Sequence, residues 1–130
     1  SIRCAMIDID HFKRVNDTYG HEAGDHVIRE IAGILRNRFR ESDIVARIGG
    51  EEFCVLVTDV QREHAVSLFS ALRKLVAKKL IDVDGREVNV TVSIGLCLDP
   101  ADSIEKMVRA ADEMLYAAKN KGRNRVEPQS

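Results

Sequence analysis

The sequence lacks an excess of charge of either sign. Its 130 residues include 20 Lys and Arg against 21 Asp and Glu, so the formal net charge is -1. Proteins that coat a nucleic-acid duplex need a broad positive field, and this balance argues against nucleic acid as a partner. Any site for a charged nucleotide must therefore be local.

Long apolar runs and closely paired cysteines are missing as well. No stretch approaches the length of a membrane-spanning helix, and Ser1 leads into a strand-like segment rather than a secretion signal. Cys4, Cys54 and Cys97 lack the pair spacing of a zinc site, and each lies in an apolar run. We therefore expect three small buried thiols in a reducing compartment, and a cytoplasmic protein without direct membrane contact.

The remaining composition suits one domain over residues 1–130, because 45% of the residues are apolar, 32% are charged, and no repeat or linker interrupts them. Apolar periodicity predicts helices at residues 11–19, 25–40, 61–80 and from 102 to 122, the last with Asp102 and Glu105 as a capping box. Strands are expected at 2–9, 43–48, 53–58, 87–98 and 124–127. This order predicts an α+β fold with a mostly antiparallel central sheet flanked by helices.

The segment 48–53, Ile-Gly-Gly-Glu-Glu-Phe, places two adjacent carboxylates on a glycine turn between two predicted strands. Glycine permits positive φ and a close approach of a ligand to the main chain, and paired carboxylates suit a divalent cation or a proton. A glycine hairpin with solvated charged flanks is the ordinary alternative. The turn alone leaves both interpretations open.

Asp8 lies where the first buried strand is expected to end. If that strand neighbours the acidic turn, Asp8 and Glu51 would form an oxygen site suited to Mg²⁺, with room for phosphate oxygens. Alternatively, Asp8 caps the helix that follows, although Asp10 is the better candidate for that cap because the helix follows it directly.

Cations lie at two other points of the chain where a phosphate group could bind. Lys13 follows His11 and Phe12 at the start of the first helix, where free N–H groups bind phosphates, but a solvated surface lysine is the ordinary interpretation. Lys119 and Arg123 are four residues apart at the end of the last helix, where cations also simply complement the helix dipole. With a triphosphate ligand, Lys119 and Arg123 would also bind phosphate groups.

In order and spacing, these segments resemble the GGDEF family of diguanylate cyclase domains, with the GGEEF variant of the motif. The matching segments cover nearly the whole chain: 8–13, 16–17, 20–21, 24–25, 49–53, 92–95, 111–112, Tyr116, Lys119 and 122–124. Five or more such matches in register are hard to obtain by chance. The resemblance implies a nucleotidyl-cyclase or palm-like fold and an enzyme that joins two GTP molecules into cyclic di-GMP, releasing two pyrophosphates.

The resemblance also implies a metal site. Mg²⁺ or Mn²⁺ would be held by Asp8, the carbonyl of Ile9 and Glu51, and Glu52 would support a second metal. Glu51 would accept the proton of a ribose 3′-hydroxyl. A free glutamate, with a pKa of about 4.3, is a weak base for an alcohol, so the metal must acidify the hydroxyl.

For the nucleotide, the resemblance implies a larger set of contacts. The residues expected to bind GTP are His11, Phe12, Lys13, Asn16, His21, Asp25, Gly49, Gly50, Lys119 and Arg123. Asn16 and Asp25 match the guanine contacts, and a carboxylate accepts from the N1–H and amino group that guanine presents and adenine does not. Asp25 as the N-cap of the second helix is the alternative.

Arg40 and Asp43 precede Gly49 in the register at which this family carries a site for product inhibition. Arginine pairs with guanine O6 and N7 and stacks on the base, while aspartate takes the N–H edge. We therefore expect inhibition by cyclic di-GMP. Ordinary surface charge is the alternative.

The family reaction needs two active sites face to face, which implies a homodimer arranged by an upstream sensory domain in a parent protein that can itself be membrane-anchored. Family members also carry, before the strand that ends at Asp8, a helix and loop with the pattern Asp-x-Leu-Thr-Gly-Leu-x-Asn-Arg. This chain begins without it, so it is expected to be truncated. The rival hypotheses are a non-catalytic receptor for GTP or cyclic di-GMP and an inactive fragment of an active parent.

Overall fold

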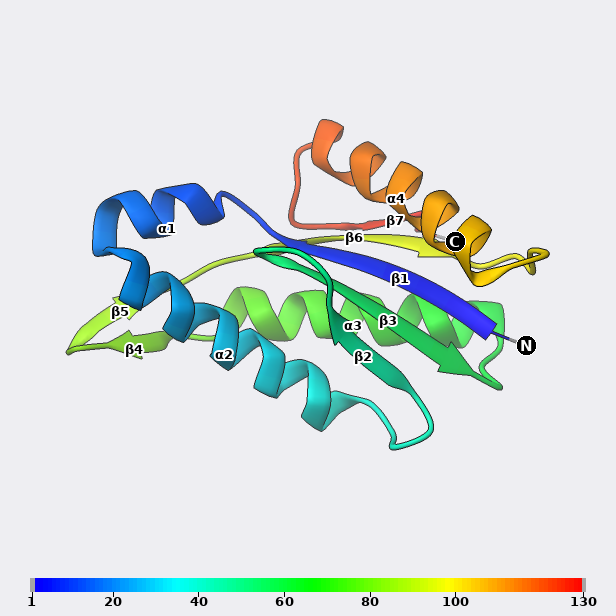
Figure 1. Ribbon diagram of the computed structural model, residues 1–130, viewed down its shortest axis with the longest axis horizontal. Helices are drawn as coiled ribbons and strands as arrows, with labels where there is room; N and C mark the ends of the chain where they lie inside the picture. The colour runs from blue at the N-terminus through cyan, green and yellow to red at the C-terminus, as the bar shows by residue number, and fades with distance from the viewer. Residues whose placement is uncertain (1, 130) are drawn as a thin grey trace.

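The computed structural model describes residues 2–129, and five strands in this part of the chain form one sheet in the order β2-β3-β1-β6-β7 (Figure 1). These strands are β1 (Ile2–Ile9), β2 (Ile44–Arg47), β3 (Glu52–Thr58), β6 (Val92–Cys97) and β7 (Val126–Glu127). All neighbours pair antiparallel except β6 and β7. A separate hairpin joins β4 (Ile81–Val83) to β5 (Arg86–Val88). The predicted mostly antiparallel sheet is confirmed.

The helices of residues 2–129 are α1 (Phe12–Tyr19), α2 (His21–Arg38), α3 (Arg62–Lys78) and α4 (Ile104–Asn120). None of them combines the length and the apolar character that crossing a bilayer requires. Helix α4 packs on one side of the sheet, and α2 and α3 pack on the other. The predicted α+β fold with flanking helices is therefore confirmed.

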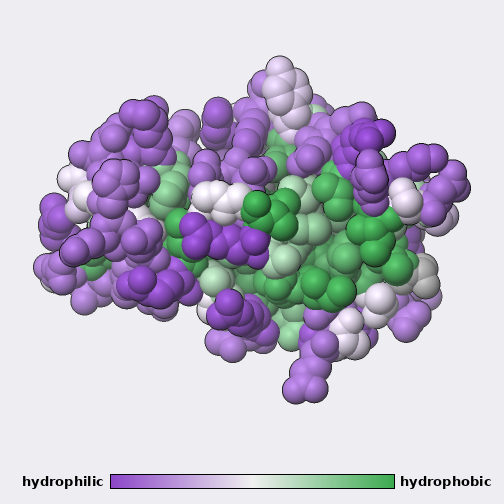
Figure 2. Space-filling view, in the orientation of Figure 1, coloured by the Kyte–Doolittle hydropathy of each residue, from purple (hydrophilic) through white to green (hydrophobic). Residues whose placement is uncertain are grey.

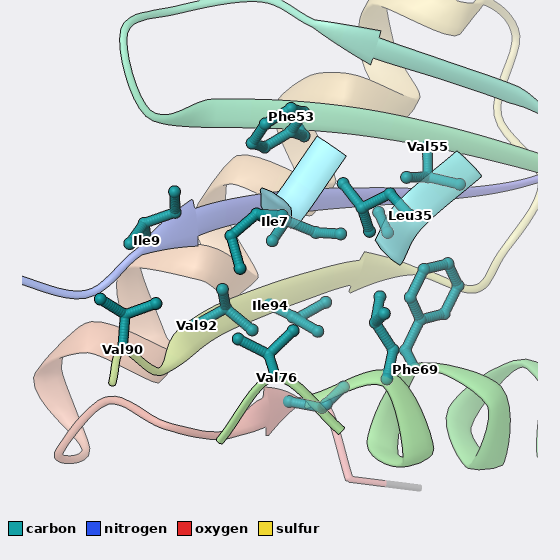
Figure 3. Close-up of a cluster of buried hydrophobic side chains, with 14 of the residues drawn as sticks. Ile7, Ile9, Leu35, Phe53, Val55, Phe69, Val76, Val90, Val92 and Ile94 are labelled. Atoms are coloured by element: carbon teal, nitrogen blue, oxygen red, sulfur yellow. The ribbon is translucent and has the colours of Figure 1, made fainter. Parts of the chain in front are cut away.

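The alternation of β1 divides the core into two clusters. Ile7 and Ile9 point into the larger cluster, which also contains Leu35 of α2 and Phe69 and Val76 of α3 (Figure 3). The even-numbered residues of β1 face α4, and their cluster consists of Cys4, Met6, Cys54, Cys97, Met107, Ala111 and Leu115. All three cysteines are buried as free thiols, as predicted.

Gly95 brings α4 directly onto β6. A Cβ at this position would lie 2.1 Å from the backbone nitrogen of Leu115 and 2.2 Å from the carbonyl oxygen of Ala111. Since backbone atoms cannot yield without moving the helix, any larger side chain would push α4 away from the sheet. The glycine thereby fixes where the end of α4 stands relative to β1.

The prediction of a loop at residues 20–24, between the first two helices, is wrong. Helix α2 begins at His21, because the chain reverses at the single residue Gly20, which has a φ of 95°. Gly24 lies inside the helix, and a Cβ there would meet the side-chain oxygen of Asn16 at 1.9 Å. Asp25 is therefore in the second turn of α2 and is not its N-cap.

Two predicted caps are also wrong. His11, in the left-handed conformation with a φ of 54°, occupies the N-cap position of α1, so Asp10 does not cap this helix. Ser103 rather than Asp102 caps α4, and its hydroxyl accepts a hydrogen bond from the backbone N–H of Lys106 at 3.2 Å.

The strand predicted at residues 87–98 is divided in the structure. Strand β5 ends at Val88 and β6 begins at Val92. Between them, the side-chain amide of Asn89 donates to the carbonyls of Ala77 and Lys79 at the end of α3, at 2.9 and 2.8 Å. This long-range contact draws the chain out of the ladder, which strand periodicity does not reveal.

Candidate active site

A pocket of about 190 Å³ lies where β1 ends, between the β2-β3 turn and the end of α4. It is lined by Asp8, Ile9, Asp10, His11, Phe12, Lys13, Glu51, Lys119 and Arg123. Eight of these nine residues are candidates from the sequence, the exception being Asp10. A larger pocket of about 460 Å³ lies between α2 and the β4-β5 hairpin and also carries the acids Glu22, Asp82 and Asp84. The smaller pocket is the candidate site because it brings together the residues expected to bind a metal ion and phosphates.

The two acidic segments are neighbours in the sheet, as the predicted metal site requires. Asp8 stands opposite Glu52 in the β1-β3 ladder, and the N–H of Ile9 donates to the carbonyl of Glu51 at 3.2 Å. Residues directly opposite in a ladder place their side chains on the same side of the sheet. The side chains of Asp8 and Glu52 therefore share the side on which α4 packs.

Asp8 is buried, with 6% of its surface exposed, and its two oxygens differ. The ammonium of Lys119 donates to Oδ2, whereas Oδ1 is buried without a hydrogen-bond partner. An unsatisfied carboxylate oxygen is costly in a protein interior. A divalent cation at Oδ1 would remove that cost, so this atom fits a metal ligand.

Glu51 and Glu52 are both half-buried on the turn. Burial raises the pKa of Glu52, and the negative charges of Asp8, Asp112 and Glu51 raise it further, while Lys119 acts in the opposite direction. Negative potential thus accumulates at the end of β1. A bound cation would relieve it.

The candidate pocket offers few ligands for a metal ion. Within residues 2–129, no group of three or more His, Cys, Asp or Glu side chains is arranged to hold a metal ion. The pocket instead offers the carboxylates of Asp8 and Glu51 and the backbone of Ile9. Mg²⁺ commonly binds through one or two carboxylates and keeps its other positions for water and phosphate oxygens, so this small donor set suits it.

Gly49 and Gly50 shape the turn in a way that the sequence did not indicate. Neither has a positive φ, contrary to the freedom that we expected them to use. A Cβ on Gly49 would lie 3.0 Å from a carboxylate oxygen of Glu52, so this glycine leaves room for the acid. The guanidinium of Arg47 donates to both glycine carbonyls and holds the turn.

Asp10 is the residue of this site that sequence reasoning misjudged. Its carboxylate accepts from the hydroxyls of Thr91 and Ser93, both at 2.6 Å, and from the backbone N–H of Asn124 at 3.0 Å. It thereby ties the segment after α4, which includes Arg123, to the sheet. The available signal was that the two hydroxyl residues alternate with Val90 and Val92.

The remaining candidate residues do not line this pocket. Asn16 belongs to α1 and its side chain lies against Gly24 of α2, while His21 and Asp25 are exposed on the first turns of α2. Their proposed contacts with guanine stay predictions, as do those of Gly49 and Gly50 with GTP.

Arg40 and Asp43 form their own cluster between α2 and β2. The guanidinium of Arg40 donates to the carboxylate of Asp43 at 3.0 and 3.2 Å, and the backbone N–H of Arg40 donates to it at 2.9 Å. Burial alone would raise the pKa of Asp43, but these bonds hold it below its usual value. The pair is preformed, and its role as a product site stays a prediction.

Comparisons with known proteins place these features in one family. A family model described as "Diguanylate cyclase, GGDEF domain" matches residues 1–125. Diguanylate cyclase A of Treponema denticola is 46% identical over 123 residues, which cover 93% of this chain and 33% of that protein. Diguanylate cyclase DgcP of Pseudomonas aeruginosa is 43% identical over 124 residues, covering 95% of this chain and 18% of its own length. The chain thus spans a third or less of these two relatives.

Solved structures show the same fold. The GGDEF domain of PA1120 from Pseudomonas aeruginosa superposes with a TM-score of 0.91 at 35% identity, covering 96% of this chain and 80% of that one. The GGDEF domain of DgcB from Caulobacter crescentus, solved in complex with c-di-GMP, gives 0.90 at 35% identity, covering 96% and 75%. The active GGEEF domain of a diguanylate cyclase from Vibrio cholerae gives 0.85 at 30% identity, covering 96% and 80%.

Proposed function

Because this chain belongs to the GGDEF family of diguanylate cyclase domains, we propose that residues 1–130 are a catalytic domain that condenses two GTP molecules into cyclic di-GMP. In each of the two steps a 3′-oxygen forms a bond to an α-phosphorus, pyrophosphate leaves, and the hydroxyl proton passes to a base. The observation that carries this proposal is the meeting of Asp8, Glu51 and three cations in one pocket.

Mg²⁺ is the proposed cofactor, and Mn²⁺ would suit the same oxygen donors. Asp8, the carbonyl of Ile9 and Glu51 would hold it, with Glu52 as support for a second ion. The unpartnered Oδ1 of Asp8 supports this assignment. When bound, the ion would acidify the 3′-hydroxyl and neutralise charge on the α-phosphate.

Glu51 is the proposed base, because it lines the pocket from a half-buried position. Lys13, Lys119 and Arg123 are proposed to position the phosphates, together with the backbone amides of His11 and Phe12. Lys13 is exposed and its ammonium pairs with Asp17 at 2.8 Å, which raises the pKa of the lysine. It would exchange this partner for a phosphate group.

The guanine base is assigned to Asn16 and Asp25, with His21 as a further contact. This assignment rests on the family match and on the fit of a carboxylate to the N–H edge of guanine. An Asp25→Ala variant should lose the preference for GTP over ATP. Equal use of the two nucleotides by the unchanged chain would contradict the assignment.

Product inhibition is proposed at Arg40 and Asp43. The related DgcB domain was solved in complex with c-di-GMP, and the exposed Arg40 guanidinium of this chain suits a guanine edge, which supports this proposal. Inhibition that is unchanged in an Arg40→Ala variant would refute this site.

A homodimer is required by the proposed reaction, since each 3′-hydroxyl attacks the α-phosphate held by the other subunit. We also propose a cytoplasmic site of action and an upstream sensory domain in a longer parent protein. The free buried thiols and the greater length of the curated relatives support these proposals.

The decisive experiment fuses the chain to a parallel coiled coil that enforces dimerisation and supplies GTP with Mg²⁺. Cyclic di-GMP and two equivalents of pyrophosphate should form. A Glu51→Gln fusion should lose at least about 10²-fold in rate yet unfold at the same temperature. If the unchanged fusion binds GTP without turnover, the chain is a receptor and the proposed activity is wrong.

A further inference from the structure

A second polar pocket, of about 410 Å³, lies between α3 and the segment that leads from α4 to β7. Its lining residues are Ser70, Arg73, Lys74, Asn124, Arg125, Val126 and Gln129. Three of them are cations and none is acidic, so positive charge is concentrated here although the whole chain carries a net charge of -1. We call this set of seven residues the basic pocket.

Both arginines of the basic pocket are oriented by uncharged partners. The Nη1 of Arg73 donates to the side-chain oxygen of Asn124 at 3.0 Å, and the Nε of Arg125 donates to the carbonyl of Arg123 at 3.3 Å. Each guanidinium has five N–H donors, so most of them remain available. The guanidinium planes are thus held in place by partners that carry no charge.

No carboxylate neutralises the basic pocket within the described part of the chain. The ion pairs of residues 2–129 involve none of its three cations. Glu127, two residues beyond Arg125, pairs instead with Lys121 at 3.4 Å. By contrast, Arg40 and Lys119 elsewhere in the fold both have carboxylate partners.

From this arrangement, we propose that the basic pocket binds a phosphate-type anion. The planar arginine forks match phosphate oxygens, and Lys74 adds a point charge. Ser70 and Gln129 add neutral donors, and the amide nitrogen of Asn124 is available because Arg73 uses only its oxygen. The proposal is independent of the cyclase activity.

The basic pocket shares no lining residue with the candidate active site, yet one short segment touches both. Arg123 lines the active-site pocket, and Arg125 lines the basic pocket. Between them, the N–H of Asn124 donates to Asp10, and φ is positive at both Arg123 and Asn124. An anion held by Arg125 would therefore contact the same segment that carries Arg123.

The test is an amide NMR titration of the full chain with sodium pyrophosphate in the absence of divalent cations. The amides of Ser70, Lys74 and Gln129 should shift and saturate with a Kd on the order of 1 mM or below. Binding at the active site is followed separately on the amides of Lys13 and Lys119. Parallel titrations with inorganic phosphate and GTP identify which phosphate source binds more tightly.

Charge variants complete the test. Lys74→Gln should weaken the pyrophosphate response at Ser70 and Gln129 roughly tenfold and leave the response at Lys13 unchanged. Arg109→Gln, which removes an exposed cation from α4, is the matched control. Equal weakening by the control, or no saturable shift at Ser70 and Gln129, would overturn the proposal, as would a response to GTP but to neither inorganic anion.

Discussion

Asp8 is the residue on which the chemistry of the pocket depends most. Within residues 2–129, its Oδ1 is the buried side-chain polar atom left without a partner, while Lys119 satisfies Oδ2. A fold tolerates such an atom at a cost of about 1–3 kcal/mol. A bound cation that contacts Oδ1 would remove this cost.

Asp8→Asn keeps the shape of this side chain and removes its charge. Binding of Mn²⁺, measured by calorimetry with a GTP analogue present, should weaken at least about tenfold, because a negatively charged ligand oxygen is lost. Thermal unfolding serves as the control for an intact fold. Unchanged Mn²⁺ affinity in a folded variant would remove Asp8 from the metal site.

Glu52 gives a prediction for pH dependence. Its pKa is raised in the folded chain by burial and by neighbouring acids, so ionisation of Glu52 costs the folded state stability. The folded state keeps its full stability below the ordinary glutamate pKa, where Glu52 is protonated. It loses part of this stability as the pH rises through the raised pKa. Glu52→Gln should therefore be more stable than the unchanged chain at pH 7.5, with a smaller difference near pH 4.

Urea unfolding of both proteins at the two pH values, without divalent cations, measures this difference. Added Mg²⁺ should stabilise the unchanged chain more than Glu52→Gln, because the ion offsets the same repulsion. A difference in stability that does not change with pH would contradict the proposed crowding of acids.

At the scale of elements, the contact between α4 and β6 sets the geometry of the pocket. Gly95→Ala would place a Cβ about 2 Å from two backbone atoms of α4. We expect a loss of about 1–3 kcal/mol or more in unfolding free energy, and weaker nucleotide binding because Lys119 moves with the helix. Chemical denaturation and GTP titration measure the two effects.

Gly33→Ala is the matched control for this prediction. Gly33 lies inside α2, and a Cβ there meets nothing within 4 Å. The substitution should stabilise the chain by about 0.5–1 kcal/mol through the better helix propensity of alanine. If Gly95→Ala were equally harmless, α4 would not be held as closely as the structure indicates.

The sequence predicted the elements well where their pattern is local. The pattern of apolar residues identified the buried β1, the β2-β3 hairpin and the apolar stripes of α2, α3 and α4. It failed where a single residue or a distant contact determines where a helix or strand begins or ends. Gly20 starts α2 four residues early through its φ of 95°, and Asn89 breaks a strand by bonding to the end of α3.

The candidate site, too, was predicted from the sequence only in part. The acids and cations of the pocket were recognisable by motif and spacing, because their residue types are typical of phosphate and metal chemistry. Asp10 was mistaken for a cap, since its partners Thr91, Ser93 and Asn124 lie more than eighty positions away in the sequence. Only the folded structure brings them together.

At the scale of the whole molecule, residues 2–129 offer one pocket that contains both Asp8 and Glu51, whereas the proposed reaction needs two such pockets. Turnover per chain should therefore rise with protein concentration for the unfused chain, and stay constant for the coiled-coil fusion, because assembly limits the first alone. Initial rates of pyrophosphate release over a range of protein concentrations measure this. A constant rate per unfused chain at concentrations where it is monomeric would contradict the dimer.

The central claim is that Asp8 and Glu51 hold one metal ion against the phosphates of GTP. The most direct measurement is a crystal structure with Mn²⁺ and a non-hydrolysable GTP analogue, in which anomalous scattering locates the ion. We predict a peak coordinated by Asp8 Oδ1, the Ile9 carbonyl and Glu51, with the phosphates beside Lys119 and Arg123. A nucleotide bound elsewhere, or an ion that contacts neither carboxylate, would contradict the account.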